Sequence, residues 1–122
     1  MARILIVEDE PLIAMLLEDW LAEMGHEPVG PVDCVDAALQ VVATAEFDAA
    51  ILDLTIRARR SDPVADALRK RGIPFAFATG DTASALDGRF AGVPTVAKPY
   101  DFAAVQRITD SLTGAAQSRQ EP

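Results

Sequence analysis

The 122-residue chain lacks features that several classes of protein need. Its one cysteine, Cys34, excludes a disulfide within the chain and suits a cytoplasmic protein. The 11 basic residues are outnumbered by 19 acidic ones, and the net charge of −8 argues against binding to nucleic acid or an anionic membrane. No apolar run approaches the length that spans a bilayer. The sequence contains no P-loop and no G-x-G-x-x-G loop, which are the motifs that indicate nucleotide binding. The length suits one domain with a buried core.

The chain does contain strand-like and helix-like segments that alternate five times. Apolar runs predict strands at about residues 3–7, 26–32, 48–52, 73–78 and 93–97. Helical spacing of apolar residues and helix-capping residues predict helices at about residues 11–24, 33–45, 61–72, 81–90 and 101–112. This alternation predicts an α/β fold with a doubly wound, five-stranded parallel sheet in the order 2-1-3-4-5 and helices on both faces. Pro28 and Pro31 agree, because they restrict the second strand to a sheet edge.

Individual residues predict how the helices begin and which sides they bury. Asp33 is expected to cap the second helix and Asp101 the last one. The first helix is expected to bury a stripe of apolar residues at helical spacing: Leu12, Leu16 or Leu17, Trp20 and Met24. We expect one domain over residues 1–113 and an unstructured tail over residues 114–122.

Charged and hydroxyl groups follow four of the predicted strands directly. Glu8 and Asp9 follow the first strand, and Asp53 closes the third. Thr79 follows the fourth strand and Lys98 the fifth. In a doubly wound sheet, ligands bind at the carboxyl ends of the strands, near the switch point between the first and third. The sequence therefore predicts that these five side chains meet in one crevice.

These residue types together suit phosphoryl chemistry. Clustered carboxylates repel one another unless a proton or a metal ion is present, and oxygen ligands with water suit Mg²⁺. Lys98 offers a compact positive charge for a phosphoryl oxygen, and Thr79 offers a hydroxyl donor. Asp53 can then act as a nucleophile that forms an aspartyl phosphate.

The segment Ile6–Glu10, Asp53 after its apolar strand, Thr79-Gly80 and Lys98-Pro99 together resemble a two-component response-regulator receiver domain, the CheY-like domain. The resemblance covers roughly residues 2–112. It implies that Asp53 is the phosphoacceptor.

The resemblance also implies roles for the other residues. Mg²⁺ would bind Asp9, Asp53 and the backbone carbonyl of Thr55, while Glu8 would act mainly through water. Glu10 is expected to be a surface acid beside this site.

Beyond the metal ligands, Thr79 would be the switch hydroxyl, and Lys98 would pair with the phosphate. Lys98-Pro99 would be the bond that is usually cis in the family.

Two positions depart from the usual receiver pattern. Thr95 stands where receivers carry an aromatic, and Arg57 stands where a proline commonly follows the phosphoacceptor by four residues. The segment Pro74–Gly80 is similar to the PFxFATG signature of the "FAT GUY" receivers. That similarity implies a stand-alone regulator in alphaproteobacterial stress or developmental signalling, served by a histidine kinase of the HWE/HisKA2 type.

The function that the resemblance implies is that of a single-domain response regulator, which is not a classified enzyme. It would accept phosphate from a histidine kinase or a histidine phosphotransfer protein, as a monomer or weak dimer. With no second domain following, output would pass through a downstream protein partner, or the chain would act as a phosphate sink. A phosphate-independent pseudo-receiver remains an alternative. A haloacid-dehalogenase-type phosphatase is disfavoured because Asp53-Leu54-Thr55 lacks the second Asp of its signature.

Three arginines lie between Thr55 and Ser61, beside the predicted site: Arg57, Arg59 and Arg60. They form either an ordinary solvated loop or a docking surface for a partner or an anionic phosphodonor.

Overall fold

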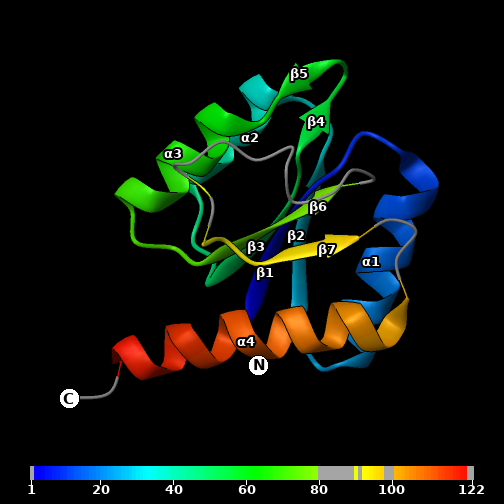
Figure 1. Cartoon of the computed structure of the whole chain (residues 1–122), viewed down its shortest axis with the longest axis vertical. Helices are drawn as coiled ribbons and strands as arrows, with labels where there is room; N and C mark the ends of the chain where they lie inside the picture. The colour runs from blue at the N-terminus through cyan, green and yellow to red at the C-terminus, as the bar shows by residue number, and fades with distance from the viewer. Residues whose placement is uncertain (1, 80–89, 91, 98–100, 121–122) are drawn as a thin grey trace.

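Five parallel strands form one sheet in the order β2-β1-β3-β6-β7 (Figure 1). This computed structural model describes residues 2–79, 90, 92–97 and 101–120. The strands are β1 (Arg3–Val7), β2 (Glu27–Val32), β3 (Ala49–Asp53), β6 (Phe75–Thr79) and β7 (Thr95–Ala97). Counted by position within this sheet, the order is 2-1-3-4-5, so the predicted fold class is confirmed. The proline-bearing strand β2 lies at an edge, as its sequence requires.

Helices cover both faces of the sheet (Figure 1). The four described helices are α1 (Pro11–Glu23), α2 (Val35–Thr44), α3 (Asp62–Lys70) and α4 (Phe102–Gln120). Helices α2 and α3 lie on one face, while α1 and α4 lie on the other. None of the described helices is both long and apolar enough to cross a membrane. The predicted helix at 81–90 falls almost wholly outside the described residues.

Strand side chains alternate between two core layers. Phe75 and Phe77 face the α2–α3 layer, whereas Ala76 and Ala78 between and after them face the α1–α4 layer. The Phe77 ring is fully buried and makes edge contacts with two rings, Phe75 and Phe90, each with centroids 5.5 Å away. Because both sides of each central strand are covered, the strands are apolar throughout rather than alternating.

The strand register aligns the carboxyl ends of the central strands. Val7 of β1 pairs with Leu52 of β3, and Asp53 pairs with Ala78 of β6. Thr79 in turn pairs with Ala97 of β7. Residues that end or follow these strands therefore lie together at the carboxyl end of the sheet.

The predicted buried stripe of α1 is partly wrong. Leu12 is 80% exposed, and of the alternatives Leu16 and Leu17 it is Leu17 that is buried, beside Ala14 and Leu21. Trp20 and Met24, also in the prediction, are partly buried against this layer. The helix is apolar on more than one side, so spacing alone could not decide which stripe faces the sheet.

The two predicted helix caps have different outcomes. Asp101 does cap α4, because its Oδ1 accepts the Ala104 N–H at 2.7 Å. Asp33 does not cap α2; that helix begins after Cys34 with no side-chain cap, and the Asp33 carboxylate instead pairs with Arg57. An arginine brought near by the tertiary fold competes for this carboxylate, and sequence-local capping rules do not include such a partner.

Helix α4 also differs from the expected chain end. It continues to Gln120, through most of the segment expected to be an unstructured tail. Alanine, glutamine and arginine in this segment are good helix formers, which offsets the cost of Gly114 inside the helix.

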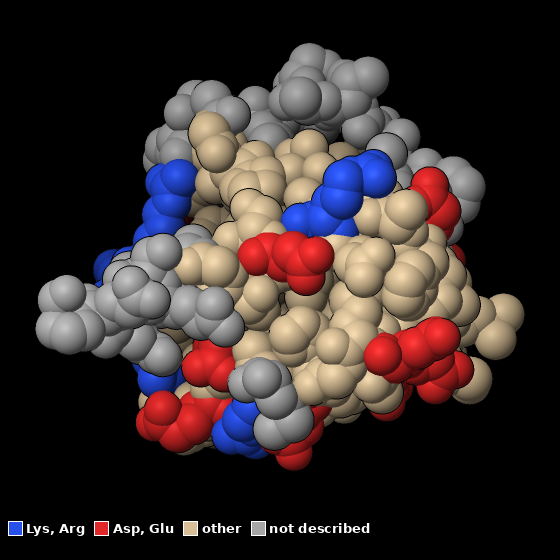
Figure 2. Space-filling model, turned by 90° about the horizontal axis from the view of Figure 1, so that it is seen from below, with Lys and Arg blue, Asp and Glu red and all other residues tan. Residues whose placement is uncertain are grey.

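Charge is unevenly placed on the face seen from below. Figure 2 shows acidic side chains there in several separate groups, with uncharged surface between them. Among the described residues of this face, basic side chains form no continuous patch.

Candidate functional site

Glu8 begins the site directly after β1, and its side chain is held inside the fold. It is only 2% exposed, and its backbone N–H donates to the Val32 carbonyl at 2.9 Å, which extends the pairing with β2. Its Oε2 accepts the Glu10 N–H at 3.1 Å. A buried carboxylate is costly unless donors or a cation compensate it.

Three acids at this strand end lie close together. Carboxylate oxygens of Glu8, Asp9 and Glu10 lie within 4.8 Å of one another. Glu8 is buried, Asp9 half-buried and Glu10 exposed, as expected for a surface acid beside the site. Carboxylate oxygens suit a hard cation such as Mg²⁺, which retains several water ligands. The carboxylates at this strand end therefore fit the class of ion that the sequence predicts; the group includes Glu8 and Asp9 but not Asp53.

Asp53 lies at the end of the neighbouring strand β3. It is 6% exposed, and its Oδ1 accepts the Thr55 N–H at 3.3 Å. Thr79 ends β6, is also 6% exposed, and lies one position beyond the residue that pairs with Asp53. Lys98 follows the last residue of β7 and lies outside the described residues. The sheet thus brings Glu8, Asp9, Asp53 and Thr79 to the carboxyl end of its strands, as predicted.

A short hairpin follows β3 where the sequence predicts only a loop. Strands β4 (Thr55–Ile56) and β5 (Arg59–Arg60) pair antiparallel through a two-residue turn, Arg57-Ala58. Both turn residues have left-handed backbones, with φ of +50° and +65°. Such turns are usually marked by glycine or asparagine, and this signal is missing from the sequence. The Arg57 N–H donates to Asp9 Oδ2 at 2.9 Å.

Each of the three arginines near the site has an acidic partner within the chain. Arg57 pairs with Asp33 at 2.9 Å, Arg59 with Asp36 at 3.5 Å, and Arg60 with Asp62 at 2.9 Å. Surface pairs of this kind contribute little to stability. They do neutralise much of the positive charge that a docking surface for an anion would need, so the structure favours the solvated-loop interpretation.

Ser61 is a structural residue of the site that sequence reasoning misses. It is fully buried, and its hydroxyl donates to the Asp53 carbonyl at 2.6 Å, with the Leu54 carbonyl sharing the same hydrogen at 3.1 Å. Its own N–H donates to the Leu54 carbonyl at 2.9 Å. In the sequence, a serine before Asp62-Pro63 indicates a helix cap, but Ser61 makes no side-chain cap to α3. It ties the far end of the hairpin back to β3.

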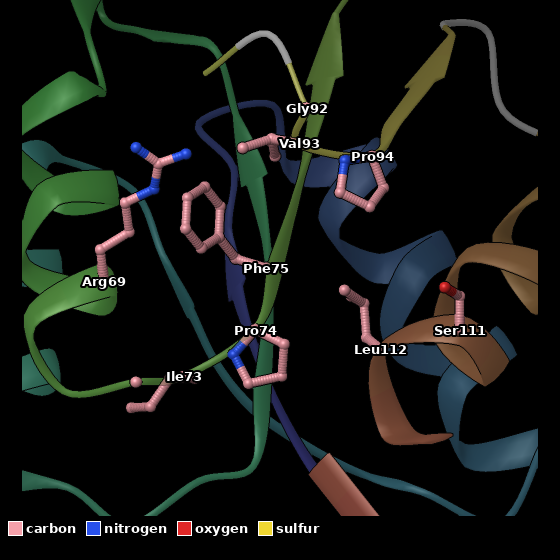
Figure 3. Close-up of a pocket in the computed structure, with 10 residues that line it drawn as sticks. Arg69, Ile73, Pro74, Phe75, Gly92, Val93, Pro94, Ser111 and Leu112 are labelled. Atoms are coloured by element: carbon pink, nitrogen blue, oxygen red, sulfur yellow. The ribbon is translucent and has the colours of Figure 1, made fainter. Parts of the chain in front are cut away.

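Two cavities lie at opposite ends of the strands of the sheet. One, of about 540 Å³, lies at the amino ends of β6 and β7, where Arg69, Phe75, Val93 and Leu112 line it (Figure 3). It is therefore remote from the acids. A cavity of about 380 Å³ adjoins the acids and is lined by Asp9, Met15, Glu18, Asp33 and Arg57, among others.

Comparison with known families decides the identity of the domain. The sequence pattern of the response regulator receiver domain matches residues 4–108. The chain belongs to the receiver domain family. The receiver domain is a signalling module rather than a classified enzyme, as the resemblance implied.

Solved receiver structures are similar over nearly the whole chain. SdrG from Sphingomonas melonis Fr1 is 47% identical with a TM-score of 0.82, covering 93% of this receiver domain and 97% of SdrG. SdrG from Pseudomonas melonis Fr1 in its BeF3-activated conformation is 46% identical with a TM-score of 0.76, covering 94% of each chain. The receiver domain of sensor histidine kinase PA1611 from Pseudomonas aeruginosa PAO1, with a magnesium ion coordinated in its active site cleft, is 26% identical with a TM-score of 0.76, covering 93% and 98% of the two chains.

A curated relative is longer than this receiver domain. The transcriptional activator protein IrlR of Burkholderia pseudomallei is 33% identical over 122 residues, which are 97% of this chain and 53% of IrlR. The chain therefore spans about half the length of the curated relatives it matches.

Asp9→Asn is expected to weaken Mg²⁺ binding by about 100-fold, because it removes one negative charge at close range from the cation. The same change should raise the melting temperature of the metal-free protein, since it reduces repulsion among the three acids. The asparagine Oδ1 can still accept the Arg57 N–H. Titration calorimetry and thermal unfolding with and without Mg²⁺ measure both effects.

Asp19→Asn is the matched control, because it makes the same charge change on the exposed side of α1. It should leave Mg²⁺ affinity unchanged. Equal affinities for the Asp9→Asn variant and the wild type would exclude Asp9 as a ligand.

Proposed function

We propose that this receiver domain accepts a phosphoryl group on Asp53, with Mg²⁺, as the response regulator of a two-component phosphorelay. The observation that carries the proposal is the position of Asp53, buried at the carboxyl end of β3 beside the acids that end β1. A carboxylate in such a place is costly unless a cation offsets it, and it is well placed to attack a phosphorus atom.

The cation would be held by oxygen atoms of this chain. Asp9 and Asp53 would bind it directly, together with the backbone carbonyl of Thr55, and Glu8 would act mainly through water. Bound Mg²⁺ supplies positive charge that offsets the charge on the transferring phosphoryl group. Glu8, which is buried, and Asp9, which is half-buried, place two carboxyl groups at this end of β1.

Thr79 and Lys98 would contact the phosphoryl group on Asp53. The Thr79 hydroxyl would donate to one of its oxygens, because Thr79 follows the residue that pairs with Asp53. Lys98 would pair with another oxygen, because it directly follows the partner of Thr79 in β7. Phosphoryl transfer depends mostly on positioning and charge stabilisation, and these side chains would supply both.

The partners of this chain are proposed from its similarity to SdrG and from its resemblance to the FAT GUY receivers. SdrG has been solved in a BeF3-activated conformation, and BeF3 imitates a phosphoryl group on an aspartate. This similarity, with the Pro74–Gly80 segment that resembles the FAT GUY signature, is the ground for proposing a stand-alone regulator. We further propose that the regulator is cytoplasmic and monomeric or weakly dimeric. Its phosphodonor would be a histidine kinase of the HWE/HisKA2 type or a histidine phosphotransfer protein. A downstream protein partner would read its state, or the chain would serve as a phosphate sink.

The alternative function is a phosphate-independent pseudo-receiver that binds partners through the same fold. One observation favours it: Thr95, which replaces the usual aromatic, is exposed on β7 beside a cavity of about 340 Å³ against α4. The usual threonine–aromatic coupling is therefore missing, although the acids of the site are present.

Incubation with a small phosphodonor and Mg²⁺ tests the proposal. Intact-protein mass spectrometry should show a gain of one phosphoryl group that survives acid and is lost in base. A metal chelator added before the donor should prevent the gain. A wild-type protein that gains no mass from the small donor or from a cognate kinase would favour the pseudo-receiver instead.

A further inference from the structure

Both acids proposed to bind the cation accept a backbone N–H from the same hairpin. Thr55, the first residue of β4, donates to Asp53 Oδ1 at 3.3 Å, and Arg57 in the turn donates to Asp9 Oδ2 at 2.9 Å. A carboxylate has about four lone-pair sites, so an oxygen that accepts one N–H keeps the capacity to bind a cation. The β4–β5 hairpin thus orients one acid from each of two neighbouring strands.

The hairpin is anchored at its base and at its turn. At the base, the Ser61 hydroxyl donates to the Asp53 and Leu54 carbonyls. At the turn, Arg57 Nε donates to the Asp33 carbonyl at 2.9 Å, and its guanidinium pairs with the Asp33 carboxylate. These contacts join the hairpin to β3 and to the segment between β2 and α2.

The backbone of Arg57 decides whether its N–H can reach Asp9. A left-handed φ of +50° costs free energy for any residue other than glycine, and the hydrogen bonds of the hairpin compensate for it. Proline, which receivers commonly carry here, has no N–H to donate and holds φ near −65°. A receiver with proline at this position cannot make the contact with Asp9.

We propose that Arg57 is a positioning residue for the cation site, acting through its backbone N–H on Asp9 rather than through its side chain. This inference rests on the proposed function, because the proposed function assigns Mg²⁺ to Asp9 and Asp53. Hydrogen bonds that orient metal ligands typically change metal affinity by 10–100-fold when they are lost. The guanidinium pair with Asp33 is more than half exposed on both sides, so its own contribution is small.

Two substitutions at this position separate the backbone from the side chain. Arg57→Gly keeps the N–H and allows the left-handed turn, but removes the guanidinium; its Mg²⁺ dissociation constant should stay within about three-fold of wild type. Arg57→Pro removes the N–H and the turn geometry; its dissociation constant should rise about ten-fold or more. Calorimetric titration with Mg²⁺ alone measures both, and hydrogen exchange of the metal-free protein should show the Thr55 and Arg57 amides protected in the wild type.

Two further variants separate this effect from general stability. Ala58→Gly relieves the second left-handed residue, so it should raise the melting temperature and leave Mg²⁺ affinity within about two-fold. Val42→Ala opens a cavity in the buried layer under α2, so it should lower the melting temperature without weakening Mg²⁺ binding. If Arg57→Pro proves too unstable to titrate, a ten-fold loss of affinity in Arg57→Gly or fast exchange of the Arg57 amide would still overturn the proposal.

Three outcomes would overturn the inference. Arg57→Pro could bind Mg²⁺ as tightly as Arg57→Gly, Arg57→Gly could lose ten-fold in affinity, or the Arg57 amide could exchange as fast as an exposed one. In each case the wild type would still bind Mg²⁺ and accept phosphate, so the proposed function would stand. A wild-type protein that does not bind Mg²⁺ would overturn both.

Discussion

Asp53→Asn is expected to lose phosphoryl incorporation by about 10⁴-fold or more, the scale of loss when a covalent nucleophile is removed. The amide oxygen has the shape of the carboxylate oxygen but carries no full negative charge, so it is a poor nucleophile. It can still accept the Thr55 N–H that Asp53 Oδ1 accepts at 3.3 Å, which should preserve the local fold. Mass spectrometry after exposure to a small phosphodonor and Mg²⁺ measures the loss.

Asp48→Asn is the matched control for this variant. Asp48 lies just before the other end of β3, where its Oδ2 accepts the Arg3 N–H at 2.8 Å. The change removes the same charge from the same strand region without touching the acids of the site, so incorporation should equal that of the wild type. Wild-type incorporation by the Asp53→Asn variant would show that another residue accepts the phosphoryl group.

The sheet and the position of Asp53 could be predicted from the sequence because both follow from topology. Alternating apolar strands and helices allow few arrangements of a parallel sheet, and Pro28 and Pro31 restrict β2 to its edge. In any such parallel sheet the carboxyl ends of neighbouring strands lie side by side. Asp9, Asp53 and Thr79 therefore come together whatever the details of side-chain packing.

The hairpin and the face of α1 could not be predicted, because they depend on contacts between distant segments. Arg57 and Ala58 adopt left-handed conformations that neither residue favours alone. The Arg57 N–H that helps to hold the turn donates to Asp9, which lies 48 positions earlier in the chain. The exposure of Leu12 on α1 is likewise a tertiary outcome, because an apolar stripe on either side of this helix fits the spacing. Local signals do not contain either result.

Phe77→Ala is expected to lower the free energy of unfolding by about 3–5 kcal/mol, the usual cost of removing a fully buried aromatic side chain. The loss includes two edge contacts, to the Phe75 and Phe90 rings, in addition to the apolar area itself. Domains of this size are stabilised by about 5–15 kcal/mol in total, so the variant should lose a large part of its stability. Urea unfolding followed by circular dichroism measures the change.

Phe102→Ala is the control, because Phe102 is only partly buried and contacts one ring, Trp20, at 5.8 Å. It should lose less than half as much free energy of unfolding as Phe77→Ala.

The comparison of the two variants also bears on the site, since Phe77 pairs with Leu52, the residue before Asp53, and lies two positions before Thr79. A cavity at Phe77 should therefore weaken the hold of β6 on β3 and lower phosphoryl incorporation, whereas Phe102→Ala, on the other layer, should leave incorporation unchanged. Equal losses of stability for the two variants would contradict the packing of Phe77 between its two aromatic neighbours.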